Sequence, residues 1–188
     1  MAGKAAVMRL LLRDGAVTLR PFAPADFDQL WAEETRDRGS FEAPWGADDE
    51  QARARVRARV DHSGTWRDQR VLDLAVELEG RVVGDVQARR DPSYEPPGLF
   101  DLGIGLFRDH RGVGVGTTAI ALIAAFLFDE EQAVRVSLST DVDNVAMRRV
   151  AEKTGFIFEG IMRGFWRVPD GPARDYALYG RTRADYGA

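Results

Sequence analysis

The sequence predicts an α/β fold, built as a mixed sheet of about seven strands with helices packed on it. Short segments in which apolar and polar residues alternate are typical of half-buried strands, and they stand between segments whose apolar residues recur at helical spacing. The length of 188 residues suits one domain. No internal repeat and no linker is visible, so residues 1–188 are expected to form a single domain, with residues 1–16 as a poorly ordered or extended N-terminal segment.

The first elements alternate between strand and helix. Val17–Arg20 is expected to be the first strand, and Pro24–Asp26 opens a short helix that runs through residue 34. A second helix begins at residues 48–50, whose carboxylates lie at the positive end of the helix dipole. Along this second helix the apolar residues recur at every fourth position and predict one buried stripe, formed by Ala52, Val56 and Val60.

Six further strands are expected, with two more helices among them. The turn Glu79–Gly80 joins the first two of these strands into a hairpin. Asp141 or Asp143 is expected to cap the last helix, and Gly155 to end it in the left-handed conformation. The expected strands are residues 72–78, 82–89, 99–107, 134–139, 156–162 and 176–181, and the apolar helix is residues 117–128.

The loop of residues 111–116 is the most informative local pattern. Gly112, Gly114 and Gly116 leave successive backbone N–H groups free of Cβ crowding, and the helix that follows adds the positive end of its dipole. These features predict a phosphate site. No lysine follows Gly116, which excludes a Walker loop, and the G-x-G-x-G spacing is not a Rossmann fingerprint. The alternative is an ordinary strand-to-helix turn without a ligand.

The strand before this loop carries two glycines on one face. Glycine weakens the interior of a strand, so Gly103 and Gly105 indicate a close approach by another backbone or a ligand. A bulge, or tight packing under a helix, is the alternative interpretation. Both interpretations remain open from the sequence.

A second motif lies downstream of the loop. Asn144 is followed by Glu152-Lys153, Gly155 and Phe156, which resembles the N-x-x-(small)-x-x-x-x-E-K-x-G-F signature of GNAT-type N-acetyltransferases. Residues 111–116 resemble the R/Q-x-x-G-x-G/A acetyl-CoA motif of that superfamily. The order of the two motifs is the family's order, and the resemblance extends from about residue 17 to about residue 183. The chain is most similar to the group named for ribosomal-protein alanine N-acetyltransferases.

The resemblance implies a single-domain acetyltransferase fold with about four helices. Its sheet would be mostly antiparallel, with a V-shaped splay between the strand before the loop and the strand after the long helix. Acetyl-CoA, the donor substrate, would enter this gap. Asn144 would bond the pantetheine arm, although in isolation it also suits a helix cap. The implied cofactor-binding residues are Leu106 and Phe107 for pantetheine, and Arg111, Gly112, Val113, Gly114, Val115, Gly116 and Thr117 for the pyrophosphate.

Acetyl transfer to an amine requires a neutral amine, and many superfamily members use a glutamate on a central strand as the base. Asp101 is the first candidate for this role, because it begins the glycine-bearing strand; a solvated strand end is the alternative. Glu77 and Asp85, on neighbouring strands, are weaker candidates. Ser139 and Asp141 stand at the mouth of the next strand, where they could position a water.

The leaving thiolate has no obvious acid. Many relatives place a tyrosine seven residues after the motif asparagine, where this chain has Ala151. Tyr176, Tyr179, Ser139 or a water would have to protonate the thiolate, unless its release needs no dedicated acid. The expected catalytic residues are therefore Asp101, Ser139 and Tyr176.

The composition limits the chemistry further. The chain has no cysteine and two histidines, so a thiolate or histidine-rich metal centre is excluded and no metal is expected. The net charge of −4 argues against broad nucleic-acid binding. The longest apolar run, residues 119–128, is shorter than the roughly 20 residues that span a bilayer. A cytoplasmic enzyme, monomeric or homodimeric, that binds neither nucleic acid nor membrane is expected.

The expected acceptor is a primary amine on a small molecule or a protein N-terminus. One alternative is another donor such as succinyl-CoA, whose carboxylate would meet Arg163 or the arginines of residues 53–59; those arginines otherwise form a solvated face. The other alternative is a non-catalytic module that binds acyl-CoA. The acceptor pocket is expected between the first two helices and the last hairpin, lined by Trp31, Phe41, Trp45, Arg163, Trp166 and Asp175.

Overall fold

The computed structural model describes residues 10–36, 49–66, 68, 70–93, 96–167 and 171–187. These residues form an α/β fold around one eight-stranded sheet, of order β1-β2-β3-β4-β5-β6-β8-β7. The predicted class is confirmed, and the described sheet has one strand more than expected because a short strand precedes residue 17 and pairs with the next. The strands are β1 (Leu12–Asp14), β2 (Val17–Arg20), β3 (Val71–Leu78), β4 (Arg81–Arg89), β5 (Leu99–Leu106), β6 (Arg135–Asp141), β7 (Ile157–Trp166) and β8 (Arg174–Thr182).

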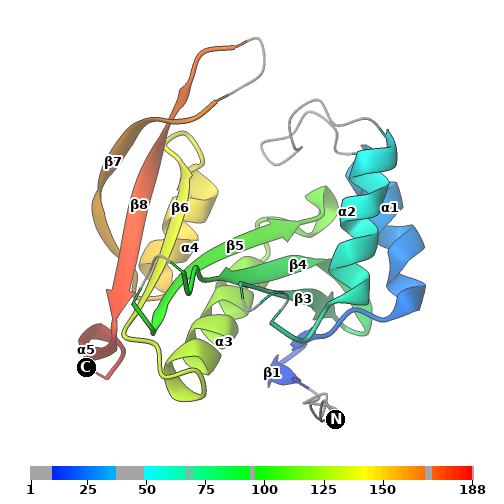
Figure 1. The fold of residues 1–188 in the computed structure, drawn as a ribbon, viewed down its shortest axis with the longest axis horizontal. Coiled ribbons are helices and arrows are strands. Elements are labelled where there is room, and N and C mark those ends of the chain that lie inside the picture. Colours follow the sequence, from blue (N-terminus) through cyan, green and yellow to red (C-terminus); the bar gives the residue numbers. More distant parts are fainter. Residues whose placement is uncertain are drawn as a thin grey trace.

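Helices cover both faces of the sheet. One face packs on α3 through Ile120, Ile123 and Leu127, which are fully buried, and the other face packs on α1 and α2 in a second core cluster around Phe27 and Val56. In Figure 1, α1 and α2 stand together on the opposite side of the molecule from β7 and β8. Five α-helices are described where about four were expected: α1 (Phe27–Arg36), α2 (Asp49–Asp61), α3 (Val115–Asp129), α4 (Val145–Lys153) and the short α5 (Arg183–Tyr186).

The sheet separates into a V between its two central strands. Neighbouring strands pair antiparallel except β5 and β6, which are parallel and pair only from Leu99 with Arg135 to Leu102 with Leu138. Beyond this point β5 continues against β4 alone, and β6 continues against β8 alone. The predicted splay is therefore confirmed, and Leu102 marks its apex (Figure 1).

Local patterns explain most of these elements. The stripe of Ala52, Val56 and Val60 is buried against the sheet, as predicted. Glu79 and Gly80 both have positive φ, at 51° and 82°, which is the conformation of a type I′ hairpin turn. Gly155 follows α4 in the left-handed conformation, as predicted. These positions depend on short-range chemistry and were accessible from the sequence.

The start of α4 corrects one expectation. Its N-cap is Asn144, whose Oδ1 accepts a hydrogen bond of 3.1 Å from the N–H of Met147. Asp141 acts one turn earlier, because its Oδ1 accepts from the N–H of Asp143 at 2.8 Å. Neither aspartate caps the helix. Aspartate and asparagine both favour caps, so the residue type alone does not decide which of the three positions caps the helix.

Candidate active site

The glycine loop opens directly onto the first turn of α3. Gly112 and Gly114 have φ of 79° and 94°, and a Cβ at either position would meet no heavy atom within 4 Å. Gly116 faces inward, where its Cβ would lie 3.5 Å from the Leu106 side chain. The first N–H groups of a helix lack the usual acceptor four residues earlier, and glycine at the N-cap offers no side chain to them. The N–H of Thr117 donates to the carbonyl oxygen of Gly114 at 3.0 Å, so the donors of the loop are those that precede Thr117. The loop is therefore an open cradle of backbone donors at a positive helix end.

The side chain of Arg111 fixes this cradle to the end of β5. Its Nε donates a hydrogen bond of 2.6 Å to the carbonyl oxygen of Leu106. The N–H of Phe107 donates to Val83 on β4 at 2.9 Å, so the backbone groups of Phe107 point toward β4. Because hydrogen-bonding directions alternate along a strand, the N–H groups of Ile104 and Leu106 point into the gap. Leu106 thus suits its expected role toward an extended ligand, whereas Phe107 has its N–H bonded within the protein.

Asn144 lies three residues beyond the end of β6, at the start of α4. Its Oδ1 is used by the helix cap, which leaves the two amide N–H donors for a ligand. The cap and the predicted ligand contact are therefore compatible. Near it, Arg148 donates to the Tyr179 hydroxyl at 3.1 Å, and that hydroxyl donates to Glu152 at 3.3 Å.

Two residues that bear on thiolate protonation are buried. Ala151 lies in the core beneath α4 and is fully buried, so the usual tyrosine position points into packed side chains. Tyr179 is also fully buried and occupied by its two hydrogen bonds. Tyr179 therefore does not reach the gap as an acid.

The three expected catalytic residues share the sheet face that α1 and α2 flank. Asp101 pairs in register with Ser137, and the Ser137 hydroxyl lies 3.5 Å from its carboxylate. Ser139 follows on the same face of β6, and Tyr176 lies opposite Asp141. Same-face residues of a strand are about 6.7 Å apart, so Asp101 and Tyr176 are separated by about 13 Å along the sheet. They do not form one contact group: Asp101 and Ser139 each lie one residue from the last β5–β6 pair, Leu102 with Leu138, and Tyr176 lies farther away.

Each candidate base is held by an arginine. The Asp101 carboxylate accepts from Arg89, with 2.7 Å between Oδ2 and Nη2. Glu77 accepts from the Nε of Arg20 at 2.6 Å. The Asp85 carboxylate pairs with Arg59 on α2 at 3.2 Å, which ties that helix to the sheet.

Other arginines of α2 also serve packing. The Arg57 guanidinium lies 3.7 Å from the centre of the Phe27 ring, and Arg53 lies over both Phe27 and Trp31. These contacts fasten α2 to α1. The arginines of residues 53–59 are therefore largely engaged by aromatic rings and by Asp85.

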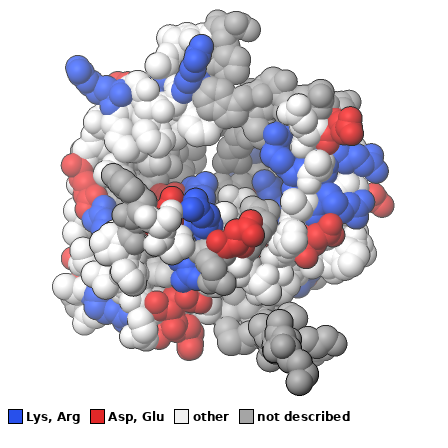
Figure 2. Space-filling view, viewed as in Figure 1, with Lys and Arg blue, Asp and Glu red and all other residues white. Residues whose placement is uncertain are grey.

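The hairpin of β7 and β8 supplies the opposite wall. Trp166 stacks on Tyr176, with ring centres 5.8 Å apart, and Asp175 accepts a hydrogen bond from the N–H of Gly164 at 2.7 Å. Arg163 is exposed on β7. Two expected pocket residues, Phe41 and Trp45, lie outside the described residues. Figure 2 shows the molecule hollowed between this wall and the helices, with acidic and basic side chains around the hollow.

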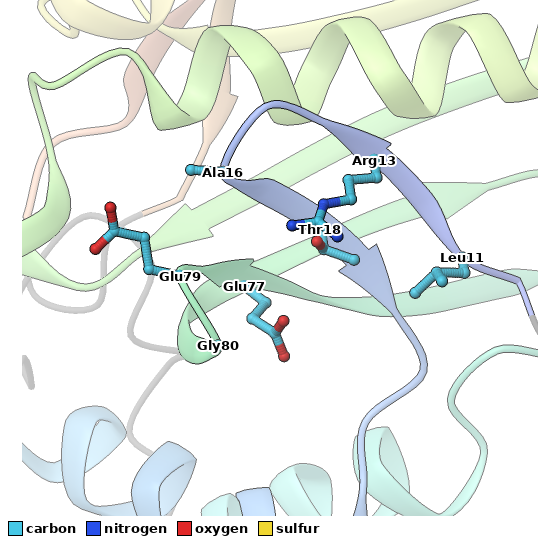
Figure 3. Close-up of a pocket in the computed structure, with 7 residues that line it drawn as sticks. All are labelled: Leu11, Arg13, Ala16, Thr18, Glu77, Glu79 and Gly80. Atoms are coloured by element: carbon cyan, nitrogen blue, oxygen red, sulfur yellow. The ribbon is translucent and has the colours of Figure 1, made fainter.

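A separate cavity of about 460 Å³ lies at the other edge of the sheet (Figure 3). It is lined by β1, β2 and the turn between β3 and β4, and Glu77 on its wall is bound to Arg20. It is remote from the splay in the strand order.

Among the described residues, no group of three or more His, Cys, Asp or Glu side chains is arranged to hold a metal ion. Within that same part of the chain, no helix has the length and apolar character to cross a membrane.

In this structure a parallel strand pair separates beside a glycine-rich helix start. This arrangement defines a class of α/β domains with a cleft for an extended anionic ligand. The chain belongs to the acetyltransferase (GNAT) domain family, whose model matches residues 16–157. The predicted family resemblance is thereby confirmed. No curated protein matches the chain.

Solved structures share the fold at low sequence identity. The RimL ribosomal L7/L12 α-N-protein acetyltransferase is 16% identical, with a TM-score of 0.77 over 96% of this chain and 98% of that one. RimJ from Mycobacterium smegmatis, in complex with CoA-disulfide, is 24% identical, with a TM-score of 0.75 over 95% and 88%. The microcin C7 self-immunity acetyltransferase MccE, in complex with acetyl-CoA and AMP, is 17% identical, with a TM-score of 0.74 over 90% and 93%.

Proposed function

We propose that the protein is an acetyl-CoA-dependent N-acetyltransferase that moves an acetyl group directly onto a primary amine. The observation that carries this proposal is the splay between β5 and β6, with an open cradle of backbone donors at its mouth. The structures of MccE and RimJ with acetyl-CoA and CoA-disulfide support the choice of donor.

The donor would lie with its pyrophosphate on the N–H groups of residues 112–116, and the Thr117 hydroxyl would add a further donor. Its pantetheine arm would extend along the free edge of β5, adding to the sheet by main-chain hydrogen bonds to Ile104 and Leu106. The amide of Asn144 would bond the same arm from across the gap. This arrangement places the thioester near the apex at Leu102, where the strands meet.

In the transfer step the amine nitrogen attacks the thioester carbonyl, an N–C bond forms and the C–S bond breaks. One proton leaves the nitrogen, and the coenzyme A thiolate takes up one proton. Ser139 lies one residue beyond the last β5–β6 pair, where the strands have separated, and it suits the positioning of a water that carries the proton. Asp101 lies one residue before that pair on β5, and Tyr176 lies farther out along the face.

Calorimetry with acetyl-CoA tests the donor half of the proposal. We expect one site per chain and competition by coenzyme A. The absence of both heat and thermal stabilisation at millimolar acetyl-CoA would overturn it. A mass-detected screen of amines, including peptides with free N-termini, then tests the acceptor half. Donor hydrolysis without any acetylated amine would favour the non-catalytic alternative.

A comparison of donors separates acetyl-CoA from succinyl-CoA. The engagement of Arg53, Arg57 and Arg59 by packing contacts favours the uncharged acetyl group, whereas exposed Arg163 remains the candidate for a donor carboxylate. Thiol release with each donor at equal concentration decides between them. We further propose a cytoplasmic enzyme, monomeric or homodimeric; sedimentation at micromolar concentration tests its size.

A further inference from the structure

Arg89 is a residue that the sequence patterns did not single out, and it lies at the apex of the splay. A Cβ built on Gly103 would stand 3.1 Å from the Arg89 Nη2 and 3.4 Å from its Cζ and Nη1. The guanidinium therefore lies flat over Gly103. Gly103 is the first residue of β5 beyond the last pair with β6. The absence of a side chain there is what gives the guanidinium its place.

One edge of this guanidinium is fixed by Asp101. Both Nε and Nη2 donate to the same carboxylate oxygen, at 3.1 and 2.7 Å. This leaves the Nη1–Nη2 edge directed away from Asp101, with two N–H donors in the fork geometry that suits a carboxylate. The Arg89 side chain is 46% exposed, so this edge is accessible to a ligand.

Other acidic groups on this face are engaged elsewhere. Asp85 is bound by Arg59 on α2, and the buried Asp73 accepts from Gln87 at 2.7 Å. Among the described residues, Asp101 is the acidic group within salt-bridge distance of Arg89. The pair thus presents a cation, oriented by its own counter-ion, beside the place where the amine must lie.

We propose that Arg89 is a specificity-determining residue that binds a carboxylate of the acceptor. The preferred acceptor is then an amine with a carboxylate close to its nitrogen, such as an amino acid or an acidic amine. This inference rests on the proposed N-acetyltransferase function and narrows its substrate class. Asp101 becomes the positioning residue that orients Arg89, which explains why the carboxylate first expected to act as a base is held in an ion pair.

Matched acceptor pairs test the proposal. Amino acids and their carboxamides are compared as acceptors by thiol release, and as ligands of the protein saturated with coenzyme A. The carboxamides have the less basic nitrogen and are the better free nucleophiles at neutral pH, so a preference for the acids must come from the protein. We expect the wild type to favour acids at least about tenfold, because a bidentate charge-assisted contact is lost with each amide.

Variants assign that preference to Arg89. Arg89→Gln should abolish the acid preference while acetyl-CoA affinity stays unchanged, and Arg89→Lys should restore part of it. Gly103→Ala should weaken the preference, because its Cβ displaces the guanidinium. Arg81→Gln, an exposed arginine at the opposite end of the same strand, is the control and should behave as wild type.

The outcomes separate this inference from the proposed function. Acetylated amines without discrimination between acids and amides would refute the role of Arg89 and leave the N-acetyltransferase proposal intact. An equal loss of activity toward acids and amides in Arg89→Gln would show that Arg89 has a structural role only. If no amine is turned over, the binding comparison still decides: equal dissociation constants for acid and amide overturn the inference.

Discussion

Gly114→Val tests whether the glycine loop binds phosphate or only turns the chain. Gly114 has φ of +94°, and a Cβ there would meet nothing within 4 Å, so valine introduces backbone strain without a clash. Gly80 offers a matched control, because its φ is +82°, it is equally open, and it lies in the turn between β3 and β4, remote from the loop. The two substitutions differ only in what lies next to the new side chain.

Both variants should lose similar stability. A side chain forced to positive φ costs about 1–3 kcal/mol, against a total of about 5–15 kcal/mol for a typical domain, so both should remain folded. The effects on binding should differ. The valine at position 114 covers the first turn of α3, and the loss of two charge-assisted hydrogen bonds at about 1.5 kcal/mol each weakens binding by about 100-fold or more.

Calorimetry with acetyl-CoA and urea denaturation measure the two effects separately. The expected result is an equal shift in the urea midpoint for both variants and a loss of affinity in Gly114→Val alone. Wild-type affinity in Gly114→Val would refute the phosphate cradle and leave the loop an ordinary strand-to-helix turn. A Gly80→Val variant that also loses affinity would show that binding depends on global stability.

Three further predictions concern single residues. Ala151→Tyr should destabilise the protein by about 1–3 kcal/mol without raising kcat, because the site is fully buried and the hydroxyl would not reach the gap; urea midpoints and steady-state rates measure this. Ser139→Ala should lower kcat about 10- to 100-fold with acetyl-CoA affinity unchanged, and an unchanged kcat would remove Ser139 from the proton path. Burial raises the pKa of Asp26, but hydrogen bonds from Arg20 and the Ala23 N–H outweigh it, so its pKa lies below the ordinary value. Its stabilisation is therefore present above about pH 4 and is lost as pH falls through the folded pKa. Asp26→Asn should cost about 1–3 kcal/mol at pH 7 and less at pH 3 in urea titrations; an equal cost at both pH values would contradict the assignment.

The parts of the fold that the sequence predicted depend on short-range chemistry. The stripe of Ala52, Val56 and Val60 repeats within one helix, and the Glu79–Gly80 turn needs only two residues with positive φ. The glycine loop, which stays a predicted phosphate site, is likewise one continuous segment. The splay was expected from family resemblance, since nothing in the local pattern of β5 or β6 states where their pairing stops.

The parts that were missed depend on which strands become neighbours. The sequence indicates a close approach at Gly103 but does not identify the approaching group. Arg89 reaches Gly103 only because β4 and β5 pair in a register that sets Arg89 opposite Asp101. A shift of that register by one residue would turn the arginine to the other face of the sheet. No periodicity within either strand contains this information.

The same dependence explains why the base was difficult to predict. A carboxylate on a central strand matches the chemistry of amine deprotonation, and Asp101, Glu77 and Asp85 all met that condition in the sequence. In the structure each accepts from an arginine that arrives from a different element or strand: Arg89 from β4, Arg20 from β2 and Arg59 from α2. The residue type shows which groups can accept a proton. The neighbouring arginines determine which of these carboxylates are held in structural ion pairs instead. Ser139 lies one residue past the last pair of β6 with β5, and the proposed water-mediated proton path through Ser139 is what the Ser139→Ala variant tests.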